Sequence, residues 1–191
     1  MSSPDSRHPR AAAAPRYTPP AMLLHWLIAA LIFVLFPLGL YMSDLGLSLR
    51  KLELYSWHKW LGITVLLLVV LRVLWRLGHR PPPLPDSVPR WQALAADALH
   101  RLLYLLILAI PLSGWALSSA AGVRVVWWGV LPLPNLLAPD HALAHSLAEV
   151  HKWLNFTMAA VVAAHVGAAL KHQFIDRDGV LLRMLPRFRK E

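Results

Sequence analysis

The sequence predicts an all-α polytopic membrane protein, built as a bundle of four transmembrane helices. The first observation is composition: 57% of the 191 residues are hydrophobic and only 15% are charged, with a mean hydropathy of +0.49. Soluble domains carry about 25% charged residues. The second observation is that residues 21–42 and 102–123 each run without one Asp, Glu, Lys or Arg. A helix of that length rises about 33 Å, enough to cross a hydrocarbon core of about 30 Å.

Four spans follow from this pattern. Backbone polar groups in lipid must find partners within their own segment, so each span is expected to be a helix. We expect one domain over 21–172, a disordered cytoplasmic tail over 1–20 and a basic cytoplasmic tail over 173–191. The Pro-rich piece 78–99 is expected to be a linker, and the apolar but proline-broken piece 125–139 a loop on the outer interface. The expected spans are 21–42, 56–77, 100–122 and 150–172.

Basic residues predict the orientation of these spans. Four spans put both termini on one side, which carries fourteen lysines and arginines, against five on the opposite side. Short basic loops stay in the cytoplasm, so both termini are expected there. The net charge of +9 flanks the spans, which indicates contact with anionic lipid of the bilayer and argues against nucleic acid as a partner.

The chain contains no cysteine. Disulfides, thiolate metal sites, iron–sulfur clusters and covalently attached c-type haem are therefore excluded. Any cofactor must be held by nitrogen or oxygen atoms.

The histidines in the spans are the candidate functional residues. An intramembrane histidine can simply be hydrogen-bonded between helices, but such residues usually face the bundle interior and have a function. His151 and His165 are fourteen positions apart, close to four helical turns, so both leave the same face about 21 Å apart along the axis. His172 continues this stripe seven residues later. One metal ion cannot bridge such a gap, so the spacing predicts two sites at two depths.

Each site needs a partner from another helix. His25 lies near the cytoplasmic end of the first span and His165 near that of the fourth, so their depths match. His58, in WHKWLG, and His151, in VHKWLN, both lie near the outer ends of their helices. Two facing pairs result: an inner pair, His25 and His165, and an outer pair, His58 and His151. Imidazole pairs without carboxylate or thiolate support suit the two axial positions of a haem iron better than zinc or magnesium.

Two further residues match these depths. Gly39 is fourteen residues after His25, at the level of the outer site, where the smallest side chain leaves room for a flat macrocycle. It also suits close contact between helices. Arg72 is fourteen residues after His58, at the level of the inner site. It is expected either to pair with a haem propionate or a quinone oxygen or to extend to the cytoplasmic surface.

Four motifs carry a family resemblance: LHW at 24–26, WHKWLG at 57–62, VHKWLN at 150–155 and AHVGAALKH at 164–172. Together they resemble the bacterial cytochrome b561 family of small di-haem membrane cytochromes, over nearly all of residues 20–175. The resemblance implies four transmembrane helices in the bacterial inner membrane and two non-covalent b haems with bis-histidine ligation. It implies the same ligand pairs as the depths do.

The resemblance also implies a function: oxidation of superoxide at the periplasmic face, with transfer of the electrons to ubiquinone. Lys59 and Lys152 directly follow the outer ligands and are candidates for steering a small anion, although headgroup contact explains them as well. Quinone reduction consumes protons. His172, His100 and Asp97 are candidate proton or quinone groups on the cytoplasmic side, where simple interfacial placement is the alternative.

Two other functions remain open. A related cytochrome can anchor a periplasmic hydrogenase or dehydrogenase and pass its electrons to quinone, with that redox protein as partner. The second alternative is a small transporter without haem, in which the intramembrane histidines relay protons or bind a metal. A haem assay on the purified protein separates this alternative from both cytochrome functions.

Overall fold

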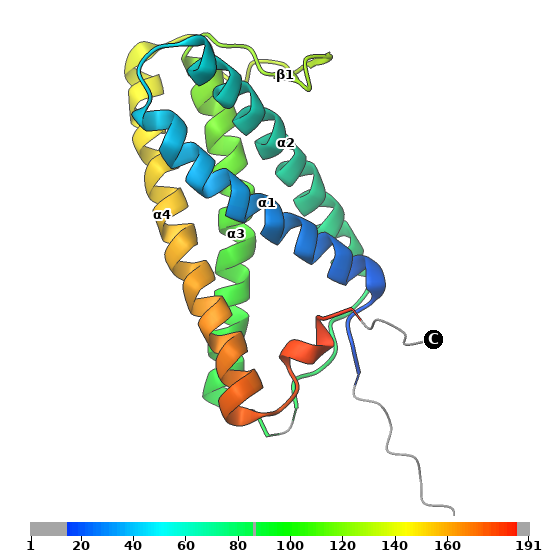
Figure 1. Ribbon diagram of the computed structural model, residues 1–191. Coiled ribbons are helices and arrows are strands. Elements are labelled where there is room, and N and C mark those ends of the chain that lie inside the picture. The colour runs from blue at the N-terminus through cyan, green and yellow to red at the C-terminus, as the bar shows by residue number, and fades with distance from the viewer. Residues whose placement is uncertain (1–14, 86, 187–191) are drawn as a thin grey trace, which may run out of the picture.

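The computed structural model describes residues 15–85 and 87–186. Within these residues the chain forms four long helices that run alternately up and down as a bundle (Figure 1). All four are long and apolar enough to cross a membrane. The predicted all-α, four-helix architecture is therefore confirmed. The helices are α1 (Pro19–Asp44), α2 (Leu49–Gly78), α3 (Arg90–Ala120) and α4 (His141–Lys171).

The distribution of apolar side chains is that of a membrane protein. The buried core is small and consists of one cluster along the bundle axis, whereas many large apolar side chains, such as Phe33 and Leu74, are exposed on the outer surface. Exposure of this kind is stable when lipid replaces water around the bundle. The buried members of the core cluster are Ile28, Val65, Val69, Leu106, Ile107 and Met158.

The helices pack as two neighbouring pairs. α1 packs mainly against α2, and α3 packs mainly against α4, with a smaller contact between α2 and α3. α1 crosses the bundle obliquely, and it has little close backbone contact with α4 (Figure 1). The backbones of α1 and α2 are therefore separated from that of α4 by their side chains.

All four helices are longer than the apolar windows that predicted them, and α3 and α4 begin furthest ahead of theirs. α3 begins at Arg90, ten residues before the expected span, and α4 begins at His141, nine residues before its expected span. Asp140 is the N-cap of α4, and its carboxylate accepts a hydrogen bond from the Leu143 amide at 3.0 Å. A capping aspartate is a sequence signal for a helix start. The added turns of α3 carry polar residues, such as Arg90, Gln92 and Asp97, so they fall outside the charge-free apolar window.

A short hairpin lies at one end of the bundle, which we call the hairpin end. Strands β1 (Val126–Trp127) and β2 (Leu131–Pro132) pair antiparallel within the segment expected to be a loop. The hairpin is held on α2 because the Trp60 indole donates to the Val126 carbonyl at 2.6 Å. The Trp127 indole donates in return to the Trp60 carbonyl at 3.2 Å. Two indole side chains therefore fix this segment on α2.

The opposite end, the termini end, holds both ends of the described chain (Figure 1). The π-helix η1 (His172–Asp176) continues α4, and a 3-10 turn η2 (Leu181–Arg183) follows it. The chain then contacts the start of α1, because the Trp26 indole donates to the Met184 carbonyl at 2.9 Å. The part of the expected C-terminal tail that the structure describes is thus folded against the bundle. Residues 1–14 and 187–191 of the two expected tails lie outside the described residues.

Candidate functional site

Two pairs of histidines face each other between the helices. His25 of α1 and His165 of α4 have ring centroids 6.3 Å apart and planes inclined at 71°. His58 of α2 and His151 of α4 have ring centroids 6.3 Å apart and planes inclined at 80°. We call the first the termini-end pair and the second the hairpin-end pair. α4 supplies one member of each, because its two histidines leave the same face four turns apart.

The separation within each pair can be compared with what one metal centre requires. A metal–imidazole bond is about 2.0–2.1 Å long and the ring nitrogen lies about 1 Å from the ring centre, so two rings on opposite sides of one metal have centroids about 6 Å apart. Both pairs match this separation at 6.3 Å. The rings are too far apart to hydrogen-bond to each other directly through their facing nitrogens. The arrangement therefore fits a central metal better than a direct contact.

A third imidazole lies beside the termini-end pair. The ring centroid of His100, on α3, is 5.2 Å from that of His165, which is shorter than a shared metal requires. His100 Nδ1 lies 2.6 Å from the carbonyl oxygen of Ala96, one turn back on the same helix. Of the two candidates, His25 therefore fits as the partner of His165, and His100 lies next to them.

Glycines give the hairpin-end pair its space. A Cβ atom placed on Gly39 of α1 would lie 3.3 Å from Cε1 of His58, and one on Gly114 of α3 would lie 3.1 Å from Cε1 of His151. Any larger side chain at either position would push a ring from its place. The sequence led us to Gly39 through its depth but not to Gly114, although a glycine in the apolar run of α3 is the same kind of signal.

The two hairpin-end rings are held differently. His151 Nδ1 lies 2.9 Å from Ser113 Oγ and 3.1 Å from the Ile110 carbonyl oxygen, both on α3. His58 Nδ1 is buried and has no hydrogen-bond partner among the described residues. Metal-bound histidines usually donate their second ring N–H to such an acceptor. Ser113 was not found from the sequence, because nothing in its spacing links it to a histidine.

The donor set narrows the possible cofactors. In the part of the chain that the structure describes, the one group of three metal-ligating side chains is His172, Asp176 and Asp178, at the termini end. Each facing pair therefore offers two imidazoles without carboxylate or thiolate. Zinc normally takes four ligands and magnesium takes oxygen, so neither suits such a pair. An iron porphyrin supplies four nitrogens of its own and needs two further ligands, so two imidazoles are a donor set that could hold it.

Comparison with known proteins agrees with this geometry. Residues 16–187 match the family described as prokaryotic cytochrome b561. The chain belongs to the prokaryotic cytochrome b561 family. It is 39% identical to "Cytochrome b561 homolog 2" of Escherichia coli over 175 residues, which cover 89% of this chain and 91% of the relative.

Two further relatives cover similar lengths of this cytochrome. "Cytochrome b561 homolog 1" of Escherichia coli is 30% identical over 187 residues, covering 90% of this chain and 98% of the relative. "Probable superoxide oxidase CybB" of Yersinia pestis is 29% identical over 174 residues, covering 87% and 93%. The membership predicted from the four motifs is thus confirmed. The protein is an electron-transfer protein of a bacterial membrane, in a family that carries b-type haem.

Arg72 is anchored within this cytochrome. Its Nη1 donates to the Ala21 carbonyl at 2.7 Å, and its Nε donates to the Tyr104 hydroxyl at 3.1 Å. Arg72 therefore joins α2 to the first turns of α1 and to α3 near the termini-end pair. These contacts take its side chain across the bundle, whereas the sequence had left open a propionate, a quinone or the cytoplasmic surface.

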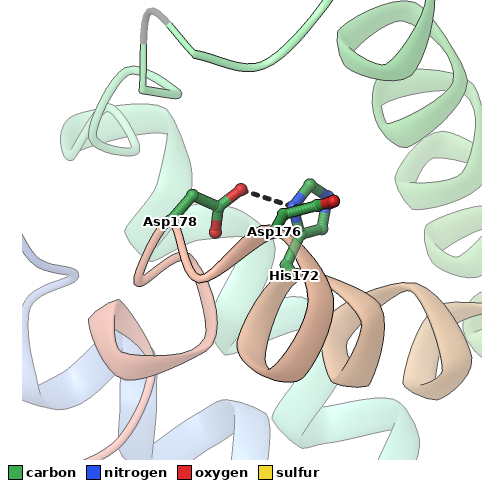
Figure 2. Close-up of side chains that lie close together, drawn as sticks. All are labelled: His172, Asp176 and Asp178. Carbon is green, nitrogen blue, oxygen red and sulfur yellow. Dashed lines mark hydrogen bonds and ion pairs between the residues drawn. The ribbon is translucent and has the colours of Figure 1, made fainter.

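His172 belongs to a small polar cluster at the termini end (Figure 2). Its Nδ1 lies 2.5 Å from Asp178 Oδ2 and 3.3 Å from Asp176 Oδ2. The Asp178 side chain is 5% exposed, and Asp176 also pairs with Lys171 at 2.5 Å. The π-helix and the turn after it bring Asp178 back to His172, which sequence spacing on a regular helix does not predict.

Of the remaining candidates, Lys152 and Asp97 are exposed and Lys59 is half-buried. Lys152 pairs with Glu149 at 2.7 Å, so its charge is largely compensated, whereas Lys59 makes no ion pair with any described residue. Asp97 pairs with Arg101 at 2.7 Å, and both side chains are mostly exposed. Asp97 is thus one turn from His100 but is directed to a surface partner.

Proposed function

We propose that this protein is a superoxide oxidase, which takes electrons from superoxide at the hairpin end and delivers them to ubiquinone at the termini end. Two superoxide anions each lose one electron and become dioxygen. One ubiquinone takes the two electrons and two protons and becomes ubiquinol. The observation that carries the proposal is the pair of facing imidazole couples, each at 6.3 Å, at two levels of one bundle.

The proposed cofactors are two non-covalent b haems. His25 and His165 would hold one, and His58 and His151 the other. When bound, such haems accept and release single electrons, which is the redox chemistry that amino-acid side chains lack. The chain's contribution is to fix the imidazoles, to leave space beside them at Gly39 and Gly114, and to surround them with apolar helices.

A haem iron held by the two histidines of either pair would have no open coordination position. Oxygen binding and oxygenase or peroxidase chemistry need a vacant position, so outer-sphere electron transfer is the activity that this ligand set supports. The family membership is consistent with electron transfer and does not by itself name the donor.

Superoxide as donor is supported by two observations. One relative carries the name "Probable superoxide oxidase CybB". The second is the charge at the hairpin end: Lys59 adjoins His58 and has no acidic partner within the described chain. A cationic side chain at this end of the bundle raises the local concentration of a small anion. Lys152 contributes less because Glu149 pairs with it.

Ubiquinone as acceptor is supported by the polar groups at the termini end. His172 is hydrogen-bonded to Asp178 and lies seven residues beyond His165 along the chain. An imidazole that is oriented by a buried carboxylate can pass a proton to a reduced quinone oxygen. His100, beside His165, is the second proton-carrying candidate. Asp97, paired with Arg101 at the surface, is the weakest of the three.

The basic residues give the orientation that the proposal requires. Both ends of the described chain lie at the termini end (Figure 1), and the loops and tails on the side of the termini carry most lysines and arginines of the sequence, so we assign this end to the cytoplasm of a bacterial inner membrane. The hairpin end then faces the periplasm.

The test has two stages. A pyridine haemochrome assay on the purified protein should give two non-covalent b haems per chain, and a colourless protein would exclude the proposal. Stopped-flow mixing of superoxide with the oxidised protein should then reduce the haems and remove superoxide faster than its spontaneous decay. Haems that stay oxidised while superoxide decays at its spontaneous rate would show that the donor is another molecule.

A further inference from the structure

We propose that Ser113 of α3 is a positioning residue for the hairpin-end haem: its hydroxyl fixes the orientation and tautomer of His151 and thereby lowers the reduction potential at that level. The inference rests on the part of the proposed function that assigns His58 and His151 as haem ligands. It does not depend on superoxide or ubiquinone being the substrates.

Three short distances define the contact. Ser113 Oγ lies 2.7 Å from the Ile110 carbonyl oxygen and 2.9 Å from His151 Nδ1, and the same carbonyl lies 3.1 Å from that nitrogen. A carbonyl can only accept, so the Ser113 hydroxyl donates its proton to Ile110. The hydroxyl oxygen then keeps its lone pairs for His151.

The tautomer of His151 follows from these roles. Both atoms that face Nδ1 are acceptors in this arrangement, so Nδ1 carries the proton and donates it. Nε2 is left with its lone pair free, which is the form in which an imidazole binds a metal. Ser113 and Ile110 thus prepare His151 to bind iron through Nε2.

The opposite ligand lacks this support. His58 Nδ1 is buried without a hydrogen-bond partner among the described residues, and the ring is confined by its close approach to Gly39. Of the two ligands at this level, His151 is therefore the one whose donor strength α3 controls. α3 supplies neither member of either facing pair, so its role at this level is to orient a ligand that another helix provides.

The hydrogen bond has a predictable electronic effect. An imidazole that donates its Nδ1–H to an acceptor becomes a more basic ligand. A more basic ligand stabilises ferric iron over ferrous iron and lowers the reduction potential. Removal of the Ser113 hydroxyl should therefore raise the potential of the hairpin-end haem and leave the termini-end haem unchanged. Ile110 remains as a second acceptor, so the variant should keep its ligand.

The experiment compares Ser113→Ala and Ser113→Thr with the unchanged protein by redox titration, after haem counting confirms that both haems are present. Ser113→Ala should raise one of the two midpoint potentials and not the other, and Ser113→Thr, which keeps a hydroxyl, should restore the original value. The matched control is Thr157→Ala on α4, which removes an exposed hydroxyl that, among the described residues, bonds only the Trp153 carbonyl within its own helix. It should change neither potential.

Electron paramagnetic resonance gives a readout that a merely structural role would not move. Nearly perpendicular imidazole planes, 80° at this level, give a strongly anisotropic low-spin ferric signal. Ser113→Ala should reduce this anisotropy for one haem as the His151 ring gains freedom. If Ser113→Ala loses a haem, Ser113→Cys, with its weaker acceptor, serves for the same titration. Unchanged potentials, equal shifts of both haems, or no rescue by threonine would overturn the inference.

Discussion

Gly39 of α1 lies directly against the imidazole of His58 on α2, where a Cβ atom would lie only 3.3 Å from Cε1 of the ring. This contact ties the identity of one residue to the position of a proposed haem ligand. Gly39→Leu should displace the ring and cost the protein its hairpin-end haem, so the pyridine haemochrome yield per chain should fall by about half. Gly39→Ala should have a smaller effect, because the ring must move by only a few tenths of an ångström.

The matched control for Gly39 is Gly167→Leu on α4. Gly167 is exposed, and a Cβ atom added there would meet no atom within 4 Å among the described residues. Its replacement should leave the haem content unchanged. Full haem content in Gly39→Leu would mean that the space beside His58 is not needed for the cofactor.

Substitution of a histidine in each of the two pairs should affect a different step of electron transfer. His151→Ala should lose the hairpin-end haem, and with it the fast reduction by superoxide, while the termini-end haem stays bound. His165→Ala should keep reduction by superoxide but lose transfer to a soluble ubiquinone analogue. Stopped-flow absorbance at the Soret band measures both steps. The reverse assignment would follow if His165→Ala abolished reduction by superoxide and His151→Ala did not.

The two lysines beside the hairpin-end ligands should differ in importance. Lys59→Gln removes a positive charge that no described acidic residue compensates, whereas Lys152→Gln removes one already paired with Glu149 at 2.7 Å. A unit charge about 7 Å from a small anion contributes about 0.6 kcal/mol in water, a factor of about three in the association rate.

The rate constant for superoxide should therefore fall about threefold in Lys59→Gln at low ionic strength, and the difference should shrink as salt screens the charge. Lys152→Gln should stay close to the unchanged protein. Equal effects of the two substitutions, or a difference that salt does not reduce, would argue against steering by Lys59.

The sequence predicted the helices and the facing histidines because both follow from regular features of a transmembrane helix, namely its apolar length and its periodicity. Apolar length gave the four spans, and fourteen-residue spacing placed His151 and His165 on one face. Whether these histidines bind haem stays a prediction. The sequence could not predict contacts that depend on how the helices are rotated relative to one another. Ser113 meets His151 only because α3 presents its hydroxyl at that level, and the spacing of 38 residues carries no such information.

The termini end was the least predictable region. The sequence indicated a basic tail after residue 172, but a π-helix and a turn reverse the chain, so that Met184 meets Trp26. Arg177 adopts a left-handed conformation with φ of 53°, which is uncommon outside glycine and ends the π-helix. Such a reversal depends on local backbone choices and tertiary contacts that hydropathy does not encode.

Arg72 should matter for the stability of the bundle. It joins three helices by donating to the Ala21 carbonyl at 2.7 Å and to the Tyr104 hydroxyl at 3.1 Å. Hydrogen bonds from charged groups contribute about 1.5–3 kcal/mol each. Arg72→Leu should therefore lower the unfolding temperature in detergent clearly, and Tyr104→Phe, which removes one of the two bonds, should lower it less. Arg76→Leu is the matched control, because Arg76 is exposed and its described contact is with the Tyr104 ring.

Asp178 should control proton delivery at the termini end if His172 serves the quinone. The Asp178 carboxylate is almost fully buried and lies 2.5 Å from His172 Nδ1, so it orients the ring (Figure 2). Asp178→Asn keeps the shape but removes the charge, and reoxidation of the reduced haems by a ubiquinone analogue should slow roughly 10-fold or more. Reduction by superoxide should not change, because it takes place at the other end of the bundle.

Asp176→Asn is the control for this prediction. Asp176 is 3.3 Å from the same nitrogen and is already paired with Lys171, so the loss of its charge should have a much smaller effect on reoxidation. Equal slowing by both substitutions would indicate that the overall negative charge of the cluster matters and not the contact between Asp178 and His172.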